Sequence, residues 1–256
     1  MKERKLMHNI NLLLVGHPGV GKTAAVEAEY SGRLVKILLS SMVEEDIAGL
    51  PWRENFEERR TKPKFIKDLE MVAEGGEGKI CLFLDEIDKA RQEVADTLLT
   101  LLQSRKIWDW HLPSCCDIVA AANPPETGGG EGVSEPMLSR FAVVEFKPNP
   151  IKWAKWCNDT YPKYRRIAEL VKAGEIPLFD TAGEGLEMRT LSPRTLELAM
   201  LAKTTTLASR EEQISGLLPA EYCHHFLEIE DEVYSEAVNV LLKSKKQRGA
   251  KAVLRL

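Results

Sequence analysis

A glycine-rich stretch at residues 16–23, GHPGVGKT, directly follows the apolar run INLLLV and precedes good helix formers over Lys22–Tyr30. It fits the pattern G-x-x-x-x-G-K-[ST] in the strand-loop-helix context that a phosphate-binding loop requires. Glycines let the backbone turn tightly and bring its N–H groups against phosphate oxygens, and the positive end of the next helix faces the same place. The stretch therefore predicts a site for a nucleoside triphosphate.

The lysine and threonine that end this stretch have separate expected roles. Lys22 is expected to contact the β- and γ-phosphates of the nucleoside triphosphate, and Thr23 is expected to bind Mg²⁺. The residues predicted to bind the nucleotide are Gly16, Pro18, Gly19, Val20, Gly21, Lys22, Thr23 and Ala24.

Two further apolar runs end in polar side chains. ICLFLDEID at residues 80–88 ends in paired carboxylates, of which Asp85 is expected to reach Mg²⁺ and Glu86 to polarise the attacking water. The run at 117–121 leads to AAANPP, which brings Asn123 to the same sheet edge, where its amide can orient that water. Solvated strand ends and a plain Asn-Pro turn are the competing interpretations.

The whole pattern predicts an α/β fold with a parallel five-stranded sheet. Continuous apolar runs of this length suit strands that are covered on both faces. The expected strands are residues 10–15, 34–39, 80–84, 117–121 and 142–146, and a helix with one apolar face is expected over 93–102.

The character of the sequence changes after FKPNP at residues 146–150. We predict an α/β nucleotide-binding core at 1–148 and a smaller helical lid domain at 149–256, with no strand beyond residue 150. The expected helices of the lid are residues 151–158, 164–173, 193–204 and 231–242, followed by a basic tail at 243–256.

Composition limits the remaining function classes. A net charge of −4 and a pI near 5.9 provide no overall basic field, so nucleic acid is possible as a partner but not favoured. The five cysteines lack any C-x-x-C spacing, which favours reduced thiols over disulfides or zinc. No run approaches the roughly 18 apolar residues of a membrane span, and the basic start with its short apolar run is interpreted as a strand rather than a signal peptide. We therefore expect a cytoplasmic protein.

These motifs, in this order, resemble an AAA+ ATPase of the MoxR-like and dynein-related branch, over residues 11–195. Residues 123–141, NPPETGGGEGVSEPMLSRF, are similar to the branch's sensor 1, loop and arginine finger, which would make Arg140 the finger. LSPRT at 191–195 resembles sensor 2, with Arg194 as its arginine. Residues 40–65 lie where the branch carries its insert in the second helix, and residues 105–119 where it carries a hairpin before sensor 1.

The resemblance implies an ATPase with Glu86, Asn123, Arg140 and Arg194 as catalytic residues and ATP with Mg²⁺ as cofactors. It also implies a homo-hexameric ring in which Arg140 completes a neighbour's site and hydrolysis drives remodelling of a protein client or partner. Neither the client nor the role of residues 51–63 follows from it.

Three alternatives remain open from the sequence. They are a nucleic-acid-directed motor of the same branch, including a GTP-specific one, a small-molecule kinase, and an assembly scaffold with little hydrolysis.

Overall fold

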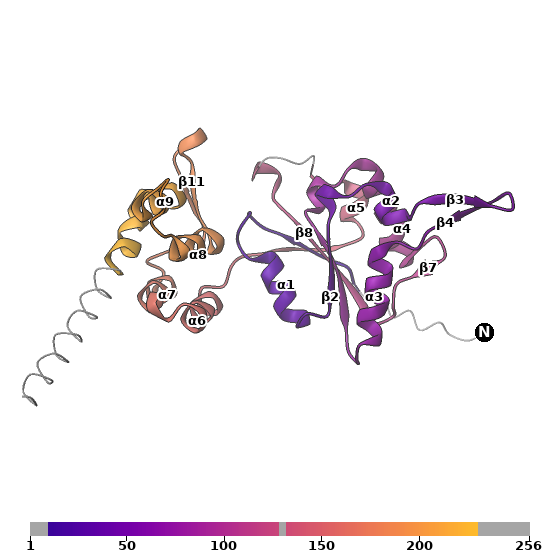
Figure 1. The fold of residues 1–256 in the computed structure, drawn as a ribbon, viewed down its shortest axis with the longest axis horizontal. Coiled ribbons are helices and arrows are strands. Elements are labelled where there is room, and N and C mark those ends of the chain that lie inside the picture. The colour runs from indigo at the N-terminus through magenta and orange to yellow at the C-terminus, as the bar shows by residue number, and fades with distance from the viewer. Residues whose placement is uncertain (1–9, 128–131, 230–256) are drawn as a thin grey trace, which may run out of the picture. The chain divides into compact units, whose positions relative to one another are not determined.

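The chain divides into two compact units, with the boundary between Lys147 and Pro148. The computed structural model describes residues 10–127 and 132–229 (Figure 1). Each unit has a hydrophobic core of its own, so each is described by itself. No helix within these described ranges is long and apolar enough to cross a membrane.

A five-stranded sheet forms the centre of the first unit. All of its neighbouring strands are parallel and run in the order β2-β5-β8-β1-β9. Its members are β1 (Leu12–Val15), β2 (Leu34–Leu38), β5 (Ile80–Asp85), β8 (Cys116–Ala122) and β9 (Ala142–Glu145). The predicted fold class is confirmed, and each of the five expected apolar runs forms one of these strands.

Helices cover both faces of this sheet, which explains why most residues of its inner strands β5 and β8 are buried. α3 (Lys64–Glu74) and α4 (Gln92–Ser104) pack on one face against residues such as Leu82. α1 (Lys22–Tyr30) packs on the other face through Val26, against residues such as Phe83. Leu82 and Phe83 are adjacent in β5 and point to opposite faces, as strand geometry requires.

Two antiparallel hairpins extend from the first unit. β3 (Pro51–Glu54) and β4 (Glu57–Arg60) follow the short helix α2 (Glu44–Ala48) and form an arm with Asn55 and Phe56 at its tip (Figure 1). This arm lies within the expected insert. β6 (Lys106–Ile107) and β7 (Trp110–His111) form the expected second hairpin, and Trp108 lies in its turn. The Arg60 guanidinium stacks on the Trp108 ring at 4.6 Å, which joins the two hairpins.

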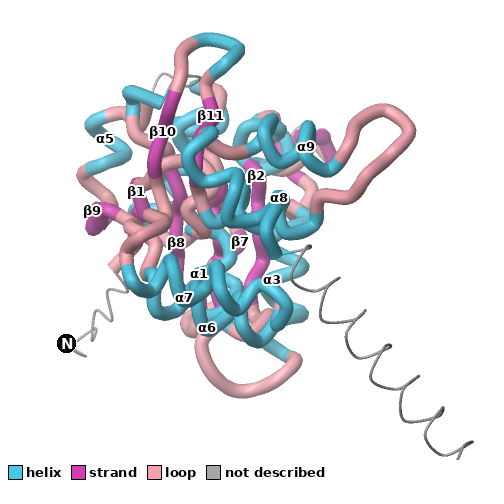
Figure 2. The backbone as a smooth tube through the Cα atoms, turned by 90° about the vertical axis from the view of Figure 1, so that its left-hand side faces the viewer, coloured by secondary structure: helices cyan, strands magenta, loops and turns pink. Residues whose placement is uncertain are grey.

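The second unit is mainly helical, with α6 (Pro150–Thr160), α7 (Arg165–Ala173), α8 (Pro193–Leu201), α9 (Arg210–Leu217) and helical residues 220–229. The expectation of no strand beyond residue 150 is wrong. β10 (Asp180–Ala182) and β11 (Arg189–Leu191) form a hairpin beside α8 and α9 (Figure 2). Strands of three residues are too short to show an alternating pattern. The expected helix at 231–242 and the basic tail lie outside the described residues.

Candidate active site

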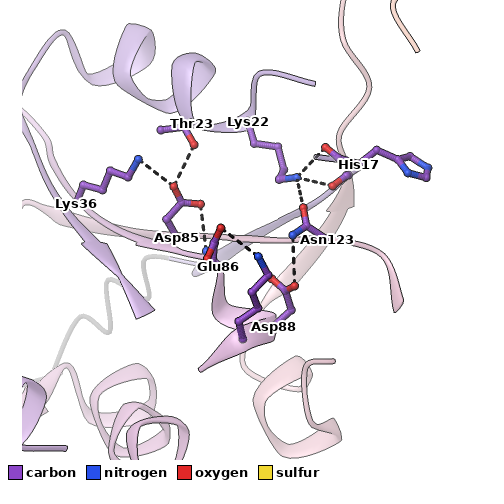
Figure 3. A network of polar contacts seen from close by, with 10 residues as sticks. His17, Lys22, Thr23, Lys36, Asp85, Glu86, Asp88 and Asn123 are labelled. Atoms are coloured by element: carbon purple, nitrogen blue, oxygen red, sulfur yellow. Dashed lines mark hydrogen bonds and ion pairs between the residues drawn. The ribbon is translucent and has the colours of Figure 1, made fainter. Parts of the chain in front are cut away.

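With the exception of Arg140, the polar side chains singled out in the first unit gather where β1, β5 and β8 end (Figure 3). Parallel pairing aligns these ends, since Val15 of β1 lies opposite Ala122 of β8. Gly16 follows β1 and Asn123 follows β8, so the two residues lie side by side. The neighbouring strand β5 contributes Asp85 at the same edge. Ligands of open α/β sheets bind at this edge.

The loop after β1 needs its glycines for two different reasons. Gly19 and Gly21 have φ values of 81° and 95°, in the left-handed region that favours glycine. A Cβ atom on Gly16 would lie 2.6 Å from the Phe146 carbonyl oxygen, so only glycine fits between the loop and the end of β9. Of the other predicted loop residues, Val20 is buried, whereas Pro18 and Ala24 are exposed. The buried valine anchors the loop to the core of the first unit.

Lys22 opens α1 and directs its ammonium group into the loop. Its Nζ atom donates to the carbonyl oxygens of Gly16 and His17, the latter at 3.1 Å, and to Asn123 Oδ1 at 3.1 Å. Gly21 is the N-cap of α1, and no side chain caps the helix there. Backbone N–H groups of a first helical turn together with a nearly buried ammonium group fit the phosphates of a nucleotide.

Thr23 and Asp85 form the pair that fits Mg²⁺. The Thr23 hydroxyl donates to Asp85 Oδ2 at 3.1 Å, and a hydroxyl and a carboxylate are the oxygen ligands that Mg²⁺ prefers. Lys36 Nζ lies 3.0 Å from the same Oδ2 atom. Sequence reasoning missed Lys36, although a lysine within the apolar run LVKIL was a signal for it.

Glu86 begins the turn after β5 in an unusual conformation. Its φ of 56° is left-handed, which is costly for a residue with a Cβ atom and is typical of functional sites. A hydrogen bond from the Ser40 hydroxyl lowers the pKa of Glu86, and the cations of Lys89 and Lys36 lower it further, against a contribution from burial that raises it. Lys89 Nζ lies 3.2 Å from Glu86 Oε1. Glu86 is therefore ionised at neutral pH and can accept a proton. Ser40 was not identified from the sequence.

Asn123 lies between a cation and an anion. Its Oδ1 atom accepts from Lys22, and its Nδ2 atom donates to Asp88 Oδ2 at 3.4 Å. Asp88 is 7% exposed and lies in the turn η2 (Ile87–Lys89). Sequence reasoning did not assign Asp88 to the site.

Arg140 lies near the amino ends of the strands, whereas this cluster lies at their carboxyl ends. The Asn11 side chain donates to its carbonyl oxygen at 3.0 Å, and Asn11 directly precedes β1. A strand rises about 3.3 Å per residue, so the five steps from Asn11 to Gly16 cover about 16 Å. The Arg140 guanidinium donates to Gln103 Oε1 at 3.2 Å and to Ser139 Oγ at 3.3 Å. The structure therefore does not bring Arg140 to the loop of its own chain.

Arg194 belongs to the second unit, where it is exposed in the first turn of α8. Ser192 caps this helix, because its hydroxyl accepts from the Thr195 N–H group at 3.2 Å. The Ser-Pro start of the motif thus has a structural use, and the catalytic role of Arg194 stays a prediction.

Comparison with known proteins identifies the first unit. The family model for the AAA domain (dynein-related subfamily) matches residues 11–141. The chain belongs to this family. It is also similar to the chaperone protein ClpB of Clostridium perfringens (strain 13 / Type A) and of Clostridium tetani (strain Massachusetts / E88), with 39% identity over 87 residues in each case. Each match covers 30% of this AAA protein and 9% of the ClpB chain, so the likeness is confined to a small part of either relative.

Proposed function

We propose that this AAA protein binds ATP with Mg²⁺ and hydrolyses the bond to the γ-phosphate. One observation carries the proposal: an ammonium group, a hydroxyl-carboxylate pair, an ionised glutamate and an amide meet at one sheet edge. They come from segments far apart in the sequence, since Lys22 and Asn123 are 101 positions apart. Local turn chemistry does not require such a meeting, whereas phosphoryl transfer uses each of these groups.

Each residue has one step in this reaction. Lys22 and the first backbone N–H groups of α1 bind the phosphates and hold the terminal one in place. Thr23 and Asp85 would hold Mg²⁺, which neutralises charge on the phosphate oxygens when it is bound. Glu86 accepts a hydrogen bond from the attacking water and then takes its proton, while Asn123 orients that water.

Arg140 acts on the site of an adjoining copy in this proposal. About 16 Å of strand separates its backbone from the loop of its own chain, so the positive charge that offsets the transition state has to come from a neighbour. Contacts of this head-to-tail kind make rings if the rotation between neighbouring copies closes. We propose a homo-hexameric ring of the MoxR-like type, as the sequence resemblance implies.

The last part of the proposal is that hydrolysis drives the remodelling of a protein client. Both similar proteins are named chaperones, which supports a polypeptide as the client rather than a nucleic acid. We propose that the second unit is a helical lid whose movement follows the nucleotide state, with Arg194 contributing at its edge. A cytoplasmic location belongs to the same proposal, since all five cysteines are free thiols.

Exchange of Glu86 for glutamine tests the chemistry. Glu86→Gln keeps the size and the polarity of the side chain but removes the proton acceptor. ATP binding is expected to stay within about 3-fold while kcat falls about 100-fold or more. Calorimetric titration and phosphate release measure the two, and Glu93→Gln on the exposed side of α4 is the matched control. Indifference to Glu86→Gln would favour a nucleotide-binding scaffold.

Mixing two inactive variants tests the neighbour's contribution. An Arg140→Ala copy retains Glu86, and a Glu86→Gln copy retains Arg140, so a mixed ring contains complete sites. We expect each variant alone to be inactive and the mixture to regain a measurable part of the wild-type rate, because an arginine supplied by a neighbour is worth about 10³- to 10⁵-fold. Full turnover by a monomer would contradict this part of the proposal.

A further inference from the structure

Asp88 is a buried carboxylate that the proposed hydrolysis does not use. It follows Asp85 by three positions and turns toward Asn123 rather than toward the Thr23–Asp85 pair (Figure 3). Its Oδ2 atom accepts from Asn123 Nδ2, while its Oδ1 atom is buried and has no hydrogen-bond partner within residues 10–127 and 132–229. A buried carboxylate oxygen without a partner costs stability, so packing alone does not account for an aspartate here.

The neighbours of Asn123 permit only one orientation of its amide. The Lys22 ammonium group can only donate, and an ionised Asp88 carboxylate can only accept. If the amide turned over, its NH₂ group would face the ammonium and its oxygen would face the carboxylate. Two attractive contacts would then become repulsive, in a half-buried setting where charge interactions are stronger than in water. Lys22 and Asp88 together therefore fix which atom Asn123 presents.

We propose that Asp88 is a positioning residue that holds the amide oxygen of Asn123 on the side of the reacting phosphate. This inference rests on the proposed hydrolysis and assigns a direction to one of its contacts. Asn123 then acts as an acceptor: its Oδ1 atom receives hydrogen bonds from Lys22 and from the attacking water, and its NH₂ group stays with Asp88. The terminal phosphate is bound by Lys22 and the backbone, and not by the NH₂ group of Asn123.

A double-mutant cycle tests whether Asp88 acts through Asn123. Asp88→Ala removes the acceptor and is expected to lower kcat about 10- to 100-fold, because a misplaced orienting group costs about that much. The KM for ATP is expected to change less than about 2-fold, since ground-state binding is untouched. In an Asn123→Ala background the same Asp88→Ala change is expected to alter kcat by less than about 2-fold. Equal factors in both backgrounds would overturn the proposal.

A milder variant keeps the test valid if Asp88→Ala does not fold. Asp88→Asn retains an oxygen that can accept from Asn123 but loses the charge, so kcat is expected to fall about 3- to 10-fold, again only while Asn123 is present. Asp96→Asn is the matched control, because this exposed α4 carboxylate accepts a hydrogen bond from the Gln92 amide at 2.7 Å. A factor that is the same with and without Asn123, including no change at all, would contradict the proposal.

A measurement that does not depend on turnover separates this inference from the proposed function. The side-chain amide ¹⁵N resonance of Asn123, assigned by its loss in Asn123→Ala, is expected to shift in Asp88→Asn and to stay in place in Asp96→Asn. Absence of hydrolysis by the wild-type protein would sink the proposed function but leave this contact testable. Hydrolysis with an unmoved resonance and equal kcat factors would sink the inference alone.

Discussion

The carboxyl edge of the sheet and the β3–β4 hairpin are both dense in charged side chains, but they hold them differently. At the sheet edge the partners come from distant positions, as Thr23 and Asp85 do, 62 residues apart. On the hairpin, Arg59 pairs with Glu57 only two positions away, and their side chains are 53% and 70% exposed. Exposed pairs of this kind contribute about 0–1 kcal/mol. At the sheet edge, long-range contacts therefore hold the charged groups in fixed positions, whereas the hairpin leaves its charges exposed to solvent.

The hairpin tip shows the same contrast in its backbone. Phe56 is fully exposed at a φ of 67°, a conformation that is unfavourable for a side chain with a Cβ atom. Glu86 at the sheet edge is also left-handed, but it is half-buried and held by Lys89. Glu86 is held by charged neighbours, whereas Phe56 lies in solvent. Substitution of Glu86 is therefore expected to affect hydrolysis far more than substitution of Phe56.

Loss of the Lys22 ammonium group should give the largest effect. Lys22→Met keeps the length of the side chain but removes the charge that faces the phosphates, so we expect ATP affinity to fall about 100-fold or more. Calorimetric titration measures it. Lys64→Met on α3, where Lys64 pairs with Asp68 at 2.6 Å and its side chain is 88% exposed, is the control. Equal effects of the two changes would end the distinction between positioned and solvated charges.

A methyl group on Gly16 should disturb both the loop and the fold. Gly16→Ala forces its Cβ atom against the Phe146 carbonyl oxygen, and we expect a loss of about 1–3 kcal/mol in the free energy of unfolding. ATP affinity should fall as well, because the loop has to move. Gly75→Ala, whose new atom would meet nothing closer than 3.5 Å, is the control for urea unfolding. A Gly16→Ala protein of wild-type stability would contradict the tight approach.

Removal of the Lys36 cation should have a moderate effect on the metal requirement. Lys36 and Thr23 share one oxygen of Asp85, so Lys36→Met frees that oxygen and should lower the Mg²⁺ concentration for half-maximal ATP binding about 2- to 5-fold. Lys79→Met is the matched control, since Lys79 directly precedes β5 and lies 2.9 Å from Asp117 near the start of β8, at the other end of these strands. An unchanged Mg²⁺ dependence in Lys36→Met would show that this cation does not compete at the site.

The smallest effect is expected at the hairpin tip. Phe56→Gly removes the unfavourable Cβ atom, so the free energy of unfolding should stay level or rise by less than about 1 kcal/mol. Basal hydrolysis should remain unchanged, because the Phe56 side chain is fully exposed to solvent. Thermal unfolding and phosphate release measure the two. A fall in basal hydrolysis would show that the hairpin and the sheet edge are not independent.

The meeting of residues at the sheet edge could be predicted where each residue belongs to a local sequence pattern. The glycine loop, the paired carboxylates and Asn123 each follow an apolar run, and parallel strands bring such ends together. Lys36, Ser40 and Asp88 were missed because their importance depends on neighbours that are distant in sequence. The spacing around Asp88 says nothing of Asn123, which is 35 positions away.

The hairpins were predicted only in part, for a different reason. The hairpin before sensor 1 was expected within residues 105–119, but its two tryptophans were not placed: Trp108 lies in the turn with a φ of 51°, and Trp110 packs against the core. Two-residue strands do not establish a period of two, and the stacking of Arg60 on Trp108 joins segments that no local pattern connects.

Strand β1 gives the contact made by Asn11 a mechanical meaning. Asn11 ties the start of this strand to the Arg140 carbonyl oxygen and to that of Leu102 at the end of α4, while Gly16 continues its other end. A strand held by ladder bonds on both sides is stiff along its axis. A displacement of the glycine loop is therefore expected to move the Arg140 backbone through β1 and Asn11. In the proposed ring, β1 of each copy would then couple the nucleotide bound by that copy to the arginine that it supplies to its neighbour.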